Sequence, residues 1–175
     1  EFKVLNLIEA YRQRGHLFTN TNPVRERRHY EPTLDIENFG LSKEDLNTKF
    51  SSATETGMGA SATLAELIVH LEKIYCESIG TEYMHINNVA EKQFIREWIT
   101  VNENHPKLSA PEKVEILEKL NQAVAFENYL HTKFVGQKRF SLEGGESLIP
   151  ALDQLITRSS QLGVDEVVLG MAHRG

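Results

Sequence analysis

The chain has 175 residues and a formal charge of −6, and 40% of its residues are hydrophobic and 25% charged. This composition is typical of a globular protein of one domain or somewhat more. The acidic balance argues against nucleic-acid binding, and no apolar run approaches the roughly 20 residues that cross a membrane. The single cysteine, Cys76, excludes an internal disulfide framework. Because Cys76 lies in an apolar helical pattern, we predict a buried, inert thiol.

The first predicted helix covers residues 4–14, where apolar side chains recur at helical spacing and Gly15 supplies a stop. A short basic cluster follows at 25–29, interrupted by Glu26. This cluster indicates a solvated loop, and a phosphate or partner contact is the less favoured alternative. The chain begins without methionine and already inside a helical pattern, which we interpret as a piece of a longer protein.

Residues 15–60 are predicted to be mostly irregular. Within them, Ser42 can cap a short helix and Asp45 can answer it in a capping box. The small and polar residues of 51–63 indicate a mobile loop. They do not indicate a phosphate-binding loop, because no Gly-Lys-Ser/Thr sequence follows the glycines.

The clearest helical pattern starts at residue 64 and runs to about residue 78, with Gly80 as its end. A shorter helix is predicted over residues 89–101. Its expected buried face consists of Phe94, Ile95 and Trp98.

A polar stretch with two prolines, residues 102–113, is the best internal boundary. It ends in a capping signature made of Ser109 and Glu112, which predicts a helix over about 110–134. The expected apolar stripe of that helix consists of Ile116, Leu120, Ala123, Phe126, Leu130 and Phe134.

After Gly136 the helical pattern stops, and a further amphipathic helix is predicted over 147–162. The β-branched run at 164–169 then predicts a short buried strand. We therefore expect a mainly α protein: a helical region, residues 1–103, followed by the opening of an incomplete α/β domain, residues 104–175.

No complete catalytic constellation occurs in the sequence, and most histidines are predicted to be ordinary surface or packing residues. These are His16, His29, His70, His85, His105 and His131. His173 differs, because it follows the predicted strand, and ligands bind beyond the carboxyl ends of strands in open α/β sheets. Histidine can shuttle a proton near neutral pH, and the adjacent Arg174 can hold a carboxylate or phosphate through two parallel hydrogen bonds.

The loop "RFSLEGGES" (139–147) is a second candidate site. Gly144 and Gly145 would let backbone N–H groups gather at a helix start, an arrangement that suits an anion. A flexible entry into the helix is the favoured alternative on local evidence.

Several stretches together resemble one family. They are "LIEAYRQRGHL" (7–17), "IYCESIGTEYMHI" (74–86), "FENYLHTKFVGQKRFSLEGGESLIPALD" (126–153) and "VVLGMAHRG" (167–175). Their order and spacing resemble those of the E1 component of 2-oxoglutarate dehydrogenase. The combination of "KRFSLEGGES" with "GMAHRG" is specific to that family, and the resemblance covers nearly the whole chain.

The resemblance implies a homodimeric, thiamine-diphosphate-dependent and Mg²⁺-dependent enzyme that decarboxylates a 2-oxo acid and passes the acyl group to lipoyl-bearing E2. It implies a location in the bacterial cytoplasm or the mitochondrial matrix. His173 matches a family histidine near the cofactor and the substrate carboxylates, Arg174 is its neighbour, and Arg139 is a weaker candidate. The family's Gly-Asp-Gly…Asn diphosphate motif and its cofactor-activating glutamate are absent here, so we expect this chain alone to be inactive and to bind no cofactor.

Two alternatives stay open at this point. The chain could be an autonomous helical domain that docks E2 without catalysis. It could also belong to an E1 enzyme for a different substrate, 2-oxoadipate, or to a carboligating 2-oxoglutarate decarboxylase.

Overall fold

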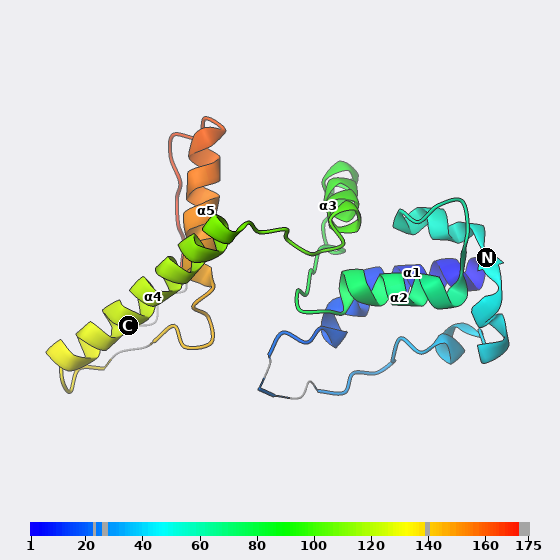
Figure 1. Ribbon diagram of the computed structural model, residues 1–175, viewed down its shortest axis with the longest axis horizontal. Helices are drawn as coiled ribbons and strands as arrows, with labels where there is room; N and C mark the ends of the chain where they lie inside the picture. Colours follow the sequence, from blue (N-terminus) through cyan, green and yellow to red (C-terminus); the bar gives the residue numbers. More distant parts are fainter. Residues whose placement is uncertain (23, 26–27, 139–140, 172–175) are drawn as a thin grey trace. The chain divides into compact units, whose positions relative to one another are not determined.

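The computed structural model describes residues 1–22, 24–25, 28–138 and 141–171 (Figure 1). The chain divides into two compact units, Glu1–Pro106 and Lys107–Gly175. Helices dominate the described residues, which confirms the expected mainly α class. That the second unit opens an α/β domain stays a prediction. No helix in the described part of the chain is both long and apolar enough to cross a membrane.

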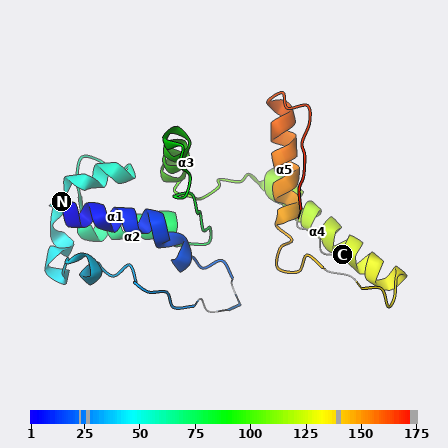
Figure 2. The same cartoon turned by 180° about the vertical axis from the view of Figure 1, so that it is seen from behind.

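The first unit is built on two neighbouring helices, α1 (Phe2–Arg14) and α2 (Leu64–Tyr75), which lie side by side in both views (Figures 1 and 2). Their predicted apolar stripes are confirmed, because both stripes face the core. The fully buried members are Val4, Leu7, Ile8, Leu64, Leu67, Leu71 and Ile74. Each such side chain contributes about 2 kcal/mol through removal of apolar surface from water.

The chain between these helices is more ordered than predicted. The capping box of Ser42 and Asp45 is confirmed at the start of a short 3₁₀ helix, η3 (Lys43–Asn47). The expected mobile loop at 51–63 is wrong. Its residues form the 3₁₀ helix η4 (Ser51–Thr56) and strand β2 (Ala62–Thr63), which pairs antiparallel with β1 (Lys49–Phe50).

Buried contacts explain why this segment is ordered. Ala53 has no exposed surface, and Thr56 is 3% exposed with its hydroxyl donating to the Ala53 carbonyl at 2.8 Å. The guanidinium of Arg12, on α1, donates to the Glu55 carbonyl at 2.7 Å. The small residues that suggested mobility therefore allow close packing against α1.

Helix α3 (Val89–Val101) has the predicted bounds, but its predicted buried face is confirmed only for Ile95 and is wrong for Phe94 and Trp98. Ile99 is 1% exposed and Ile95 packs partly against the core, whereas Phe94 is 68% and Trp98 53% exposed. The buried face of the helix is therefore centred on Ile95 and Ile99, displaced toward the side of Ile99 from the expected face.

The second unit contains helices α4 (Ala110–Lys133) and α5 (Leu148–Gln161), which contact each other. The predicted capping box is confirmed, with the Glu112 carboxylate accepting from the Ser109 backbone N–H at 2.7 Å. Lys119 and Asp153 join the two helices through a 2.8 Å ion pair. Neither helix has a fully buried residue, and the predicted stripe of α4 is confirmed only in part: Ile116, Leu120, Ala123 and Leu130 are half-buried.

The predicted strand over 164–169 is wrong for the described structure. Residues 164–171 form no strand, and they run back beside α5 in both views (Figures 1 and 2). A strand needs a neighbour for its backbone N–H and C=O groups, and no described residue pairs with this segment. Val168 is accordingly 91% exposed.

The ends of α1 and α2 lie close together. Helix α2 ends at Tyr75, three residues before the predicted end, and the N–H of its cap residue Cys76 donates to the Glu72 carbonyl. The predicted end of α1 at Gly15 is confirmed, but Gly15 has an ordinary helical φ of −54° and begins the 3₁₀ helix η1 (Gly15–Phe18). A Cβ at Gly15 would lie 2.5 Å from the Tyr75 Cβ, so glycine is required for close approach.

Replacing Gly15 with alanine is therefore expected to lower the free energy of unfolding of the first unit by about 1–3 kcal/mol, because the added methyl group forces α1 and α2 apart. Urea unfolding followed by the fluorescence of Trp98, the only tryptophan, measures this unit. Gly59→Ala is the matched control, since a Cβ there meets nothing within 4 Å. Equal unfolding midpoints for the two variants would contradict the close-approach argument.

Candidate functional site

The site residues predicted from the sequence, Arg139, His173 and Arg174, all lie outside the described residues. Their roles stay predictions. Among the described residues, no group of three or more His, Cys, Asp or Glu side chains is arranged to hold a metal ion.

The described part of the glycine-rich loop, residues 141–147, satisfies its own backbone N–H groups. The Leu142 N–H donates to the Glu127 carboxylate at 2.7 Å, and the Gly144 N–H donates to the Glu146 carboxylate at 3.0 Å. The Gly145 N–H donates to the Leu142 carbonyl at 2.7 Å. Because two of these three donors already face carboxylates of the chain, the structure favours a helix entry over an anion site.

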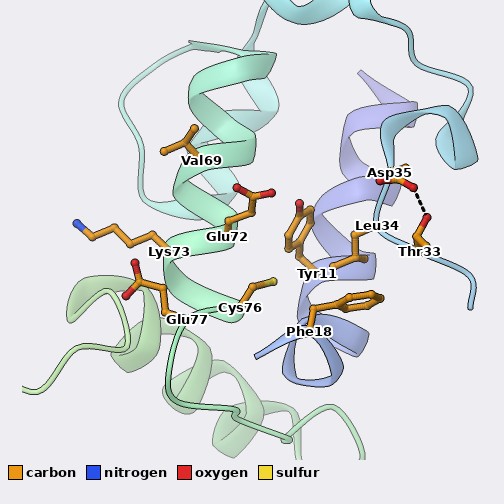
Figure 3. Close-up of a pocket in the computed structure, with 10 residues that line it drawn as sticks. All are labelled: Tyr11, Phe18, Thr33, Leu34, Asp35, Val69, Glu72, Lys73, Cys76 and Glu77. Carbon is orange, nitrogen blue, oxygen red and sulfur yellow. Dashed lines mark hydrogen bonds between the residues drawn. The ribbon is translucent and has the colours of Figure 1, made fainter. Parts of the chain in front are cut away.

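A pocket lies in the first unit, between α1, α2 and the segment 33–35 (Figure 3). It has a volume of about 740 Å³. Its lining combines aromatic and aliphatic surface with charged groups: Tyr11, Phe18, Thr33, Leu34, Asp35, Val69, Glu72, Lys73, Cys76 and Glu77.

Helix periodicity explains how α2 contributes to this pocket. Val69, Lys73 and Cys76 follow one another at spacings of four and three residues, so they lie on one side of the helix. Glu72 extends that side toward Tyr11 of α1 (Figure 3). On the opposite wall, Asp35 accepts a hydrogen bond from the Thr33 hydroxyl at 2.6 Å.

The charged side chains of the pocket differ in their pairing. Lys73 forms a 2.6 Å ion pair with Glu103, and Glu77 lies 3.4 Å from the His105 ring. The Glu72 carboxylate forms no ion pair with any described residue. The pocket therefore has an uncompensated negative charge on the α2 side.

The surroundings of the pocket raise the pKa values of the Cys76 thiol and the Tyr11 phenol. Burial, reinforced by the negative charge of Glu72, raises the pKa of the Cys76 thiol to about 12. Burial also raises the pKa of the Tyr11 phenol above its ordinary value, and the negative charges of Glu72 and Asp35 add to the effect. Cys76 is half-buried, and its raised pKa agrees with the predicted inert thiol, because the thiolate is the reactive form.

Sequence reasoning missed this pocket. It predicted apolar stripes on the first helix and on α2, and Tyr11, within the first of these helices, is buried. The sequence did place Glu72 and Cys76 four residues apart beside the stripe of α2, which puts them on one side of that helix. The sequence pattern did not predict where the segment 33–35 would lie, and this segment forms the opposite wall of the pocket.

The comparisons with known proteins concern the whole chain. Over 175 residues, 99% of the chain, it is 42% identical to the 2-oxoglutarate dehydrogenase E1 component of Brucella ovis. The corresponding proteins of Brucella canis and Brucella suis give the same values. This chain is homologous to part of the 2-oxoglutarate dehydrogenase E1 component. No protein-family model matches the chain.

The resemblance to the E1 component that the sequence motifs indicated is thus confirmed. The chain spans 17% of the length of these curated relatives. The described residues do not themselves fit the thiamine diphosphate of the E1 family, because they contain no metal-holding cluster and their glycine-rich loop binds its own carboxylates. No step of E1 chemistry can therefore be derived from them.

Proposed function

We propose that this chain is part of an E1 component of the 2-oxoglutarate dehydrogenase complex. The full-length protein would decarboxylate 2-oxoglutarate oxidatively and transfer the acyl group to the lipoyl arm of E2, as a step of the tricarboxylic acid cycle. The observation that carries this proposal is the 42% identity over 99% of the chain to proteins of that name. The protein would act in the bacterial cytoplasm or the mitochondrial matrix.

Within such an enzyme, we assign the site residues of this stretch to His173 and Arg174, with Arg139 as a weaker candidate. A doubly charged 2-oxo acid needs cationic and proton-carrying groups around its carboxylates, which histidine and arginine supply. Thiamine diphosphate, held with Mg²⁺ by parts of the homodimer outside this chain, would supply the electron sink for decarboxylation.

The apolar surface of the second unit supports a catalytic-domain piece over an autonomous docking module. Among its described residues none is buried, and large side chains such as Phe126, Leu155 and Leu169 are each more than half exposed. A free-standing module would cover such a surface within its own fold, because exposed apolar patches of this extent promote association. Further parts of a larger domain would provide the cover.

A titration with cofactor tests this proposal. We expect the 175-residue chain to show no saturable calorimetric binding of thiamine diphosphate with Mg²⁺, and no release of CO₂ from 2-oxoglutarate, because its described residues offer no diphosphate site. A full-length E1 component that carries this stretch, assayed in parallel, should bind the cofactor and act on 2-oxoglutarate.

Two results would contradict parts of the proposal. Stoichiometric cofactor binding by the isolated chain would show that it is not a dependent piece. A full-length protein that turns over 2-oxoadipate at least as efficiently as 2-oxoglutarate would correct the substrate while leaving the E1 class in place.

A further inference from the structure

We propose that the pocket between α1 and α2 binds an alkylammonium group, with the cation between Glu72 and Asp35 and the alkyl stem against the apolar wall. This inference goes beyond the proposed function and does not depend on it, since the pocket lies wholly within the first unit. Unpaired carboxylates, a tyrosine and an apolar wall line this pocket together (Figure 3).

The charged side chains that line the pocket are not all paired. Three carboxylates and one ammonium line the pocket, and that ammonium, Lys73, is already held by Glu103 at 2.6 Å. Of the carboxylates, Glu77 faces the ring of His105. The remaining pair, Glu72 and Asp35, have no cationic partner among the described residues. A cationic ligand would supply the missing charge.

Tyr11 lines the pocket and is only 3% exposed. Its hydroxyl forms no hydrogen bond with any described residue. An occupant of the pocket that donates a hydrogen bond to the Tyr11 oxygen would supply a partner that the described residues do not provide. An ammonium has three such donors. Figure 3 shows the ring of Tyr11 lying between the two helices, with Glu72 on one side and Asp35 on the other.

The walls of the pocket offer apolar surface beside the charged groups. Phe18, Leu34 and Val69 provide aromatic and aliphatic surface beside the carboxylates. Aromatic faces also attract a cation electrostatically. A volume of about 740 Å³ lies within the range of small-molecule sites, so a stem of several methylene groups fits beside the charged head.

Other ligand classes fit less well. An anion would face the negative charge of Glu72 and Asp35, and a neutral apolar molecule would desolvate these carboxylates without pairing them. A metal ion is disfavoured because the described residues contain no cluster of three suitable ligands. The combination of carboxylates, a neutral phenol and an apolar wall favours an organic cation.

Calorimetric titration of the 175-residue chain with 1,5-diaminopentane and with Nα-acetyl-lysine methylamide tests the proposal at low ionic strength. We expect saturable binding that Glu72→Gln weakens by roughly fivefold or more, as removal of one close charge partner does. Glu82→Gln is the matched control, because it makes the same charge change on an exposed residue outside the pocket and should leave the affinity unchanged. Added salt should weaken binding to the unmodified chain.

The two ligands distinguish the source of the ammonium. Tighter binding of the diamine supports a free amine as occupant, and tighter binding of the lysine derivative supports the side chain of a partner protein. Absence of saturable binding of both ligands would overturn the proposal. So would equal affinity for 1-pentanol, or equal affinities of the Glu72→Gln and Glu82→Gln variants. Circular dichroism of each variant verifies that the helices remain folded.

Discussion

Replacing Asn104 with alanine is expected to destabilise the first unit by about 2–4 kcal/mol. Asn104 is 8% exposed and its side-chain amide donates to the Ile74 carbonyl at 3.1 Å and to the Ile79 carbonyl at 2.9 Å. Ile74 lies in the last turn of α2, where carbonyls have no partner within the helix. The amide of Asn104 therefore closes the end of α2 and joins it to the end of α3.

The backbone of Asn104 adds to the expected loss. Its φ is 49°, in the left-handed region that asparagine tolerates better than alanine does. Alanine would thus lose the two hydrogen bonds and also acquire backbone strain of about 1 kcal/mol. Asn104→Gly separates the two effects, because glycine removes the strain and leaves the carbonyls unpaired.

Guanidinium unfolding followed by Trp98 fluorescence measures both variants, since Trp98 lies in the same unit. We expect Asn104→Gly to fall between the unmodified chain and Asn104→Ala. Asn102→Ala is the control, because the Asn102 amide donates to the exposed end of α3 and its loss should cost under about 1 kcal/mol. An Asn104→Gly variant as stable as the unmodified chain would show that the amide hydrogen bonds do not hold the two helix ends together.

Local signals predicted the helices of this chain well. The apolar stripe of α2 and the capping boxes at Ser42 and Ser109 were sufficient to locate helix starts, because a cap and a periodic stripe depend on neighbours within one or two turns. The bounds of α3 were likewise predicted. These elements required no knowledge of their tertiary partners.

Features that depend on a distant partner were predicted less well. The apolar arc of α3 includes Phe94, Ile95, Trp98 and Ile99, and only packing against the rest of the unit determines that Ile99 is the buried one. A β-branched run at 164–169 indicated a strand, but a strand forms only with a neighbour to accept its hydrogen bonds. The pocket was missed for the same reason. Its second wall is the segment 33–35, whose residues follow neither helical nor strand periodicity.

The second unit shows how these limits bear on function. Its helices have the amphipathic pattern of a domain interior, yet Phe126 is 61% and Leu155 51% exposed. Among the described residues, the burial that this pattern predicts is therefore only partial. The roles of His173 and Arg174 stay a proposal that rests on the family resemblance, because the strand expected before them is not formed in the described structure.

The second major prediction concerns His173 in a full-length E1 component that carries this stretch. We expect His173→Ala to lower kcat/KM for 2-oxoglutarate by about tenfold or more, which corresponds to about 1.4 kcal/mol of lost transition-state stabilisation. The reason is that imidazole can hydrogen-bond a substrate carboxylate and carry a proton, and the alanine methyl group can do neither. His173→Gln would retain hydrogen bonding without proton transfer, so a partial recovery in KM with a persistently low kcat would indicate a proton-carrying role.

The control for this experiment is His29→Ala, which removes an exposed histidine in a segment that we interpret as a solvated loop and should leave turnover unchanged. Steady-state release of CO₂ at several pH values measures all three variants, with thiamine diphosphate and Mg²⁺ at saturation. If His173 titrates during turnover, its removal should also flatten the pH profile of kcat/KM between about pH 5 and 8, where histidine changes charge.

Unchanged kinetics in His173→Ala would remove this residue from the site. A loss of activity with an unaltered pH profile and an unaltered KM would instead contradict its contact with the substrate carboxylates and leave only a structural role.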